Sequence, residues 1–244
     1  MASVTGPALV QTRGLMLYFG GLRAVDGVDF ALHPGEIHAL IGPNGAGKTT
    51  FVSLLSGRLL PQSGSITLAG EDITRLPAHE RVRKGIAYTF QITSIFPRLS
   101  VFDNVALAVQ SRAVQSRAAR DLSLHTRAAL ARVGLVDLEA QEAQTLSYGH
   151  QRLLELAMGL ALQPRVLILD EPTQGLAASE IEGFKRLVQS LVPATTVLLI
   201  EHNMEVVMDL ATRITVLNFG RVLATGTPAE IRANPAVQEA YLGA

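Results

Sequence analysis

The segment from Gly42 to Thr49 reads Gly-Pro-Asn-Gly-Ala-Gly-Lys-Thr, and it constrains the fold more than any other part of the chain. It follows a compact strand predicted over 36–41 and precedes a helix predicted over 48–56. Glycines at this spacing before a Lys-Thr pair are typical of a phosphate-binding loop, or P-loop. The glycines let backbone N–H groups converge on phosphate oxygens, and the helix N-terminus adds partial positive charge. The predicted nucleotide-binding residues are Gly42, Pro43, Asn44, Gly45, Ala46, Gly47, Lys48, Thr49 and Thr50.

Lysine is scarce in this chain, and its scarcity supports the P-loop. Of the 21 basic residues only three are lysines, at positions 48, 84 and 185. A chance match to the motif is therefore expected in only about a few chains per thousand. We predict that Lys48 binds the β and γ phosphates and that the Thr49 hydroxyl is a ligand of Mg²⁺.

Composition excludes several classes of protein. The 244 residues carry 21 basic and 21 acidic side chains and no cysteine. Without cysteine the chain has no disulfides, zinc thiolates or thiol catalysis. A net charge of zero argues against direct binding to nucleic acid or to an anionic bilayer. No apolar run approaches the ~18 residues of a membrane span, and residues 1–7 do not resemble a secretory signal. We expect a cytoplasmic protein that reaches a membrane only through a partner.

Two carboxylates follow a purely apolar strand predicted over 166–169. Asp170 and Glu171 then lie at the carboxyl end of a buried strand, where open α/β sheets bind ligands. Asp170 is placed to hold Mg²⁺ through water, and Glu171 to polarise an attacking water. The spacing alone does not decide which carboxylate has which role. The alternative interpretation of the pair is an acidic turn that follows a strand and has no catalytic role. The chain has no Asn-Lys-x-Asp guanine motif, which favours ATP over GTP.

Strand and helix patterns alternate through the final third of the chain, which predicts a mostly parallel sheet covered on both faces. The first third contains short strands separated by turns, and the middle is rich in helix patterns and looks like an insertion. The predicted fold class is therefore α/β, with a P-loop core.

The order of motifs resembles the ATP-binding subunits of ABC transporters. After the P-loop come Gln91, the segment Leu146-Ser-Tyr-Gly-His150, the Asp170-Glu171 pair, and His202. The resemblance implies one nucleotide-binding domain over 1–244, with a core at about 1–95 and 163–244. It also implies an N-terminal antiparallel β subdomain and a helical subdomain at about 96–162.

The resemblance also implies roles for individual residues. Gln91 would contact Mg²⁺ and the attacking water and couple the site to membrane subunits. His202 would contact the γ-phosphate, and Phe19 would stack on adenine. The signature residues, which would bind ATP held by the opposite subunit, are Ser147, Tyr148, Gly149 and His150.

Among ABC proteins, the chain is most similar to the ATPases of branched-chain amino acid importers. The segments that carry this likeness are 19–25, 146–149, 199–204 and 240–243. Related ATPases for urea or for lipopolysaccharide export share parts of the pattern. The implied partners are a second ATPase bound head to tail, integral membrane permeases and, indirectly, a periplasmic binding protein, with no nucleic acid. The alternatives are a soluble ABC ATPase in translation or DNA repair, and a regulatory subunit without turnover.

Two positions depart from the family pattern. His150 stands where the signature usually has Gln, so a contact there would depend on pH. Ala177 stands at the position of the D-loop Asp. Losing both polar groups would weaken the contact across the dimer, and the hypothesis is that this chain contributes the weaker site of an asymmetric pair.

Overall fold

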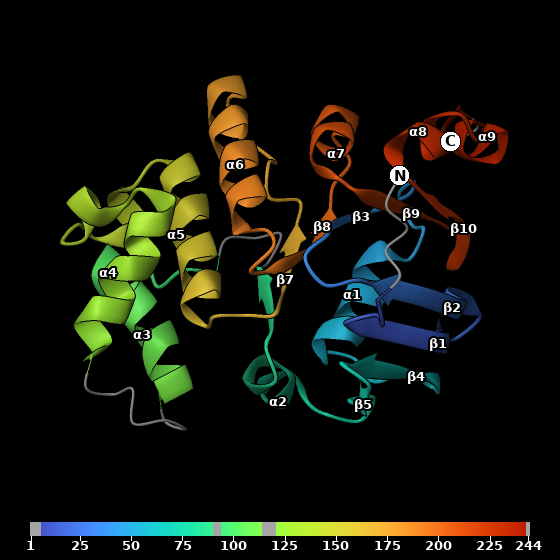
Figure 1. Ribbon diagram of the computed structural model, residues 1–244, viewed down its shortest axis with the longest axis horizontal. Coiled ribbons are helices and arrows are strands. Elements are labelled where there is room, and N and C mark those ends of the chain that lie inside the picture. The colour runs from blue at the N-terminus through green and yellow to red at the C-terminus, as the bar shows by residue number, and fades with distance from the viewer. Residues whose placement is uncertain (1–5, 90–93, 114–120, 243–244) are drawn as a thin grey trace.

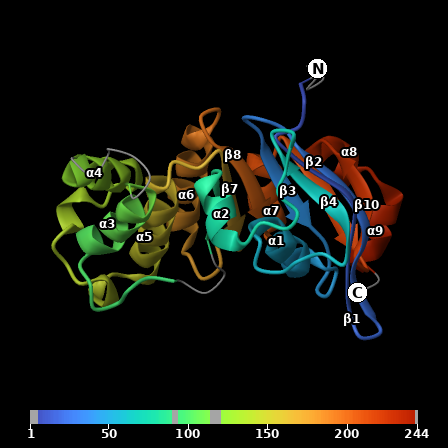
Figure 2. The same cartoon turned by 90° about the horizontal axis from the view of Figure 1, so that it is seen from below.

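The computed structural model describes residues 6–89, 94–113 and 121–242. Figure 1 shows helices α3, α4 and α5 at one end and two β-sheets toward the other, with helix α6 between them. Figure 2, turned by 90°, keeps the same order.

The first sheet is antiparallel and has the order β2-β1-β4-β5. Its strands alternate between buried and exposed residues over much of their length, because only one face of the sheet packs on the core. This sheet confirms the predicted antiparallel β region near the N-terminus. Its strands are β1 Val10–Phe19, β2 Leu22–Leu32, β4 Ser63–Leu68 and β5 Glu71–Asp72.

The second sheet has the order β10-β9-β3-β8-β7-β6. Every pairing is parallel except that of β10 with β9. All residues of β3, β7 and β8 are buried, since both faces of these strands are covered, and this accounts for their mostly apolar sequences. The strands are β3 Ile37–Ile41, β6 Ile86–Thr89, β7 Val166–Asp170, β8 Thr196–Ile200, β9 Arg213–Asn218 and β10 Arg221–Gly226.

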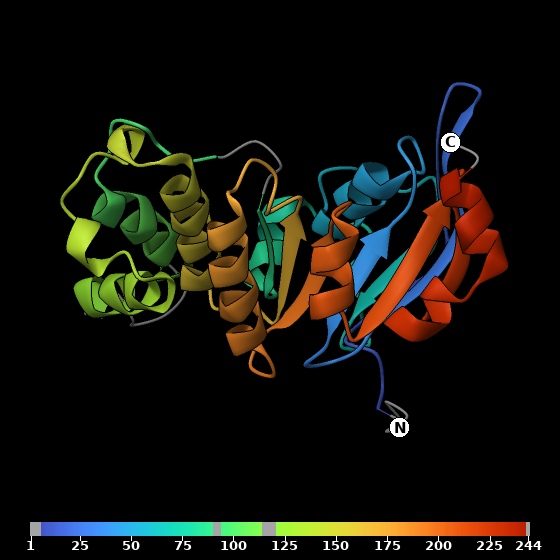
Figure 3. The same cartoon turned by 90° about the horizontal axis from the view of Figure 1, so that it is seen from above.

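Helices cover both faces of the second sheet. One face packs with α1 and the first sheet, in a core that includes Phe51, Leu54 and Ile168. The other face packs with α6, α7, α8 and α9, which Figure 3 shows side by side. The helices outside the inserted region, including the short α2, are α1 Lys48–Ser56, α2 Ala78–Arg83, α6 Ala178–Leu191, α7 Met204–Leu210, α8 Pro228–Arg232 and α9 Pro235–Leu242.

The inserted helices are α3 Val101–Ala113, α4 Leu122–Val133 and α5 Tyr148–Ala161. Buried leucines and valines from all three share one core with the adjacent face of the sheet. Ser100 caps the start of α3, because its Oγ accepts the backbone N–H of Asp103 at 2.9 Å. The proposed division at residues 96 and 162 stays a prediction.

Local signals define several element boundaries. Helix α1 has the predicted bounds, and Gly57 ends it with a φ of 79°. Thr227 begins α8 with a capping box made of two hydrogen bonds with Glu230. Within the described residues no helix is both long and apolar enough to cross a bilayer.

Candidate functional site

The P-loop connects the carboxyl end of β3 to the first turn of α1. Gly42 and Gly47 have φ values of 152° and 98°. A Cβ on Gly42 would lie 2.2 Å from the carbonyl oxygen of Leu217. On Gly47 it would lie 2.1 Å from the carbonyl oxygen of Ala24. Only glycine fits at these two positions, so the loop is packed tightly against neighbouring backbone.

The side chain of Lys48 bends back over the loop. Its Nζ donates to the carbonyl oxygens of Gly42 at 2.7 Å and Pro43 at 3.0 Å. Burial lowers the pKa of Lys48, while the carboxylates of Glu171 and Asp170 oppose that shift. The ammonium group is therefore close to the two predicted acidic residues. In the sequence, Lys48 is 122 positions from Asp170 and 123 from Glu171.

Asp170 is the last residue of β7 and is almost completely buried. Its Oδ2 accepts a hydrogen bond from the hydroxyl of Tyr88, on the neighbouring strand β6, at 2.6 Å. Burial raises the pKa of Asp170, and the Tyr88 hydrogen bond opposes that rise. The guanidinium of Arg58 lies 5.7 Å from the centre of the Tyr88 ring. Sequence reasoning did not identify Tyr88 or Arg58.

Glu171 and His202 face each other across the ends of β7 and β8. The Oε1 of Glu171 lies 3.3 Å from Nδ1 of His202. Glu171 has a φ of 49°, and its backbone N–H donates to the carbonyl of Ile200 at 2.9 Å. This left-handed conformation is strained for glutamate, and such strain is found mainly at functional sites.

A second buried carboxylate holds the two loops together. Glu201 accepts the backbone N–H groups of His202 at 2.9 Å and Asn203 at 3.1 Å through Oε2. Its Oε1 accepts the backbone N–H of Thr173 at 3.2 Å and also the Thr173 hydroxyl. Glu201 thus fixes the segment after Glu171 to the segment that carries His202. Its position directly before His202 was the only sequence signal for it.

The remaining nucleotide-binding candidates lie at the end of β1 and in the first turn of α1. Phe19 ends β1 at the tip of a hairpin and is 50% exposed, so its ring is available to a ligand. Thr49 lies in the first turn of α1 and is exposed, and Thr50 is half-buried. Hydroxyl and carboxylate oxygens such as those of Thr49 and Asp170 suit Mg²⁺, which takes few protein ligands and several from phosphates. The described residues hold no cluster of three metal-binding side chains.

The signature residues lie apart from the P-loop. Ser147 begins α5, and its hydroxyl accepts the backbone N–H of His150 at 3.3 Å, which confirms the predicted cap. Ser147, Tyr148 and His150 are exposed. Figures 1 and 3 place α5 on the opposite side of α6 and β7 from α1. One chain therefore does not join its own signature to its own phosphate loop.

The start of α5 packs on the start of α6. A Cβ on Gly149 would lie 2.2 Å from Oε1 of Glu180. The other oxygen of Glu180 accepts the backbone N–H of Ala177 at 2.8 Å, in place of a cap from the Ala177 side chain. The side chain of Glu180 thus connects the signature to the D-loop position within the chain. Gln91 lies outside the described residues.

Two family models match the chain. The model described as ABC transporter matches residues 25–174. The chain belongs to the ABC transporter ATPases. A second model, described as Branched-chain amino acid ATP-binding cassette transporter, matches residues 221–244 of this ATPase.

Curated relatives match this ATPase over nearly their whole length. It is 41% identical to the High-affinity branched-chain amino acid transport ATP-binding protein LivG of Escherichia coli K12, covering 96% of this chain and 98% of LivG. It is 40% identical to BraF, the protein of the same description in Pseudomonas aeruginosa, over the same shares. The Lipopolysaccharide export system ATP-binding protein LptB of Escherichia coli is 34% identical over 97% of this chain and 98% of LptB.

Solved structures share the fold of this ATPase. The ADP conformation of MJ1267, an ATP-binding cassette of an ABC transporter, superposes with a TM-score of 0.86 at 25% identity. It covers 98% of this chain and 100% of MJ1267. A nucleotide-free cassette from an ABC transporter gives a TM-score of 0.85 at 27% identity, covering 97% and 100%. The predicted family, fold class and ATPase activity are confirmed, and the chain binds ATP as a member of this family.

Proposed function

We propose that this ATPase is the ATP-hydrolysing subunit of an importer of branched-chain or related amino acids. The similarity to LivG and BraF, at 41% and 40% identity over 96% of the chain, supports this substrate class. The match of residues 221–244 to a branched-chain amino acid transporter model supports it independently. Lipopolysaccharide export is the second candidate, and the lower identity to LptB makes it the weaker one.

The convergence of Lys48, Asp170, Glu171 and His202 supports the proposed chemistry most directly. Glu171 accepts the proton of the water that attacks the γ-phosphate. His202, 3.3 Å from Glu171, contacts the γ-phosphate and keeps the glutamate aimed at that water. Lys48 leaves the loop carbonyls to bind the β and γ phosphates.

The metal and base sites complete the proposal. Thr49 and Asp170 would hold Mg²⁺, with Gln91 as a further contact, and a bound ion would supply positive charge beside the phosphates. Phe19 stacks on adenine, where its exposed ring meets the base. The other P-loop residues supply backbone N–H groups.

We further propose that two ATPase subunits close head to tail. In that arrangement Ser147, Tyr148, Gly149 and His150 of one subunit meet the ATP bound by the other. The exposed signature, on the opposite side of α6 from the P-loop, supports this arrangement. The partner would be a second ATPase, and permease subunits would hold the pair on the inner face of the membrane.

The Glu171→Gln variant tests the proposed chemistry. ATP still binds, because Gln keeps the shape of the side chain, whereas turnover falls by at least about 100-fold, the usual contribution of a general base. ATP binding is measured by equilibrium dialysis and turnover by phosphate release. Glu239→Gln, at an exposed position on α9, is the matched control. Turnover within about twofold of wild type in Glu171→Gln would exclude Glu171 as the base.

The transport role is tested by what copurifies with the chain after mild detergent extraction. Integral membrane subunits are expected, and vesicles containing them should accumulate leucine only with ATP. Copurification with ribosomes or DNA would instead favour the soluble alternative.

A further inference from the structure

A cavity of about 530 Å³ opens between the two sheets, away from the P-loop. Strands β1 and β2 line one side and strands β9 and β10 the other. Its polar lining includes Arg13, Asp29, His33, Arg213, Thr215 and Thr225. Facing sheets usually bury apolar side chains between them, so a polar cavity at this place requires another reason.

Two guanidinium groups of the lining are available to a ligand. Arg13 is exposed, and its one hydrogen bond in the described structure goes to Oε1 of Gln11, at 3.3 Å. Arg213 has no ion pair or side-chain hydrogen bond within the described residues. Hydrogen bonds with Thr227 lower the pKa of Glu230, and the charge of Arg213 adds a smaller lowering without contact between the two side chains. Two guanidinium groups at one cavity are suited to bind the oxygens of a carboxylate or a phosphate.

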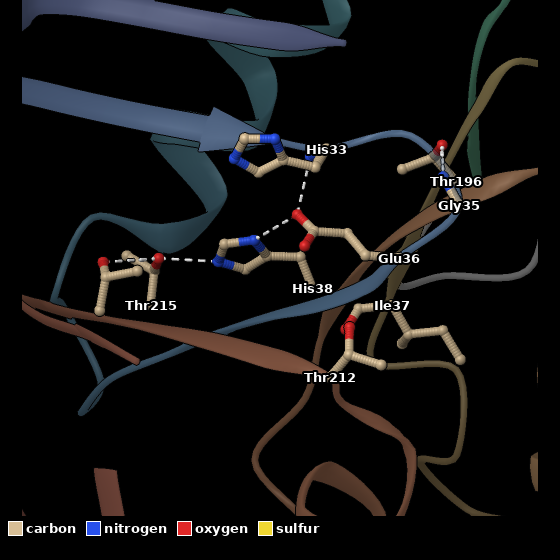
Figure 4. A network of polar contacts seen from close by, with 9 residues as sticks. His33, Gly35, Glu36, Ile37, His38, Thr196, Thr212 and Thr215 are labelled. Atoms are coloured by element: carbon tan, nitrogen blue, oxygen red, sulfur yellow. Dashed lines mark hydrogen bonds and ion pairs between the residues drawn. The ribbon is translucent and has the colours of Figure 1, made fainter. Parts of the chain in front are cut away.

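A chain of hydrogen bonds behind the cavity fixes the direction of its donors (Figure 4). Hydrogen bonds from His38 and from the His33 backbone hold the pKa of Glu36 below its ordinary value despite burial, so Glu36 is an acceptor. His38 therefore donates from Nδ1, and burial lowers its pKa, which leaves Nε2 as an acceptor. The Thr215 hydroxyl, 2.8 Å away, must then donate to Nε2.

The last hydroxyl in this chain presents an acceptor to the cavity. Thr225 Oγ1 lies 2.9 Å from Thr215 Oγ1. Because the Thr215 proton is directed to His38, Thr225 donates its own proton to Thr215. Only lone pairs of Thr225 remain for a ligand. The cavity thus offers guanidinium donors from two strands and a hydroxyl acceptor from a third.

Two further polar groups, from His33 and Asp29, belong to the same cavity. Nδ1 of His33 is buried and has no hydrogen-bond partner within the described residues. Asp29 uses Oδ1 to accept the backbone N–H of Gly14 at 2.7 Å, and its carboxylate adds negative charge beside the arginines. A buried nitrogen without a partner is uncommon in a folded protein and requires an explanation.

The geometry points to a binding site for a small organic anion that also carries an ammonium or hydroxyl group, the class of amino acids and hydroxy acids. Arg13 and Arg213 bind the anionic group. Asp29 and Thr225 Oγ1 accept from the second group. A ligand there would also act on β3, because His38 belongs to that strand and the strand ends at the P-loop.

Pairs of small molecules that differ by one group test whether the site recognises the second group as well as the anionic group. L-leucine and 4-methylpentanoate differ only in the ammonium group, as do L-glutamate and glutarate, and L-malate and succinate differ only in the hydroxyl. Binding is measured by isothermal titration calorimetry on the full chain, saturated with MgADP so that the P-loop is occupied. At least one probe with both groups should bind saturably, and its partner about tenfold more weakly, as expected for one lost charge-assisted hydrogen bond.

Arginine variants locate the binding. Arg213→Gln and Arg13→Gln should each weaken it by about tenfold, whereas Arg186→Gln, at an exposed position on α6, should leave it unchanged. If Arg213→Gln does not fold, the exposed Arg13 still supplies the test. The inference is overturned if no probe binds saturably, or if the probes that lack the ammonium or hydroxyl group bind as tightly as the probes that carry it. It is also overturned if all three arginine variants bind the probe with equal affinity. The measurement involves no ATP turnover, so its failure leaves the proposed function intact.

Discussion

The carboxylate of Asp170 is subject to two opposing influences at the end of β7. Burial raises its pKa, and the hydroxyl of Tyr88, 2.6 Å away, opposes that rise and orients one oxygen. Tyr88→Phe removes the opposing hydrogen bond, so the pKa of Asp170 rises further. A larger protonated fraction competes with Mg²⁺. We expect the Mg²⁺ concentration for half-maximal ATPase activity to rise about tenfold, and by more at pH 6 than at pH 8.

A second tyrosine provides the control for this experiment. The hydroxyl of Tyr18 donates to Asp26, a carboxylate outside the proposed metal site, at 2.6 Å. Tyr18→Phe should leave the Mg²⁺ dependence unchanged. An unaltered Mg²⁺ titration in Tyr88→Phe at both pH values would show that Asp170 needs no orienting hydroxyl.

Residues in local motifs could be predicted from the sequence, and residues that act across strands could not. Lys48, Asp170 and Glu171 were found because each occurs in a short pattern with a defined chemistry. Tyr88 contacts Asp170 across 82 positions, and Glu201 contacts Thr173 across 28. Their roles depend on which strands are neighbours in the sheet, and a single sequence does not reveal that order.

At the scale of elements, Asp26 joins three strands beside the P-loop. It accepts hydrogen bonds from Tyr18 on β1 and from Arg221 on β10, the latter at 2.8 Å from Nε. These two hydrogen bonds, from Tyr18 first, lower its pKa to about 2 from an ordinary value of 3.8. A lowered pKa means that the ionised carboxylate stabilises the folded state at pH values above 3.8, and that this stabilisation disappears as the pH falls through about 2.

Asp26→Asn should therefore lower the thermal unfolding midpoint at pH 7, and the difference from wild type should shrink as the pH falls from about 4 to about 2. Circular dichroism melts over this range measure the effect. Asp137→Asn, at an exposed position between α4 and α5, is the control and should change the midpoint little. A deficit that is constant from pH 7 to pH 2 would mean that the charge of Asp26 does not contribute.

The packing of α5 on α6 gives another element-scale prediction. A Cβ on Gly149 would lie 2.2 Å from Oε1 of Glu180, so Gly149→Ala displaces the Glu180 side chain and breaks its hydrogen bond to the backbone N–H of Ala177. Loss of a cap of this kind costs about 1 kcal/mol. Urea unfolding should show this loss. The double variant Gly149→Ala/Glu180→Ala should be more stable than the sum of the single effects predicts, and strict additivity would contradict the contact.

Element prediction succeeded where a segment carried its own boundaries. Helix α1 was predicted at its observed bounds because the P-loop begins it and Gly57 ends it. Strand β5 has only two residues, and β10 is an edge strand that alternates between exposed and half-buried residues. Neither has a continuous apolar run, so pattern reasoning passed over both.

At the scale of the whole molecule, the two halves of the proposed ATP site lie on opposite sides of α6. In the proposed arrangement the chain would bind ATP with its P-loop, while its signature would serve the ATP of another subunit. This separation predicts that ATP binding and turnover depend on different parts of one chain. The inserted helices carry the signature, and their distance from α1 is a property of the complete fold that no local motif in the sequence contains.

Ser147→Asn tests this separation without removing the helix cap, since Asn caps a helix N-terminus about as well as Ser. The larger amide replaces the exposed hydroxyl that would meet the γ-phosphate across the dimer. ATP affinity of the separate chain should stay within about twofold of wild type, while turnover of the assembled ATPase pair should fall at least about tenfold, as expected when a donor to transition-state charge is lost. Lys48→Ala is the reciprocal variant and should lose ATP binding in the separate chain. Weaker ATP binding by the separate Ser147→Asn chain would instead place both motifs at one site within a single subunit.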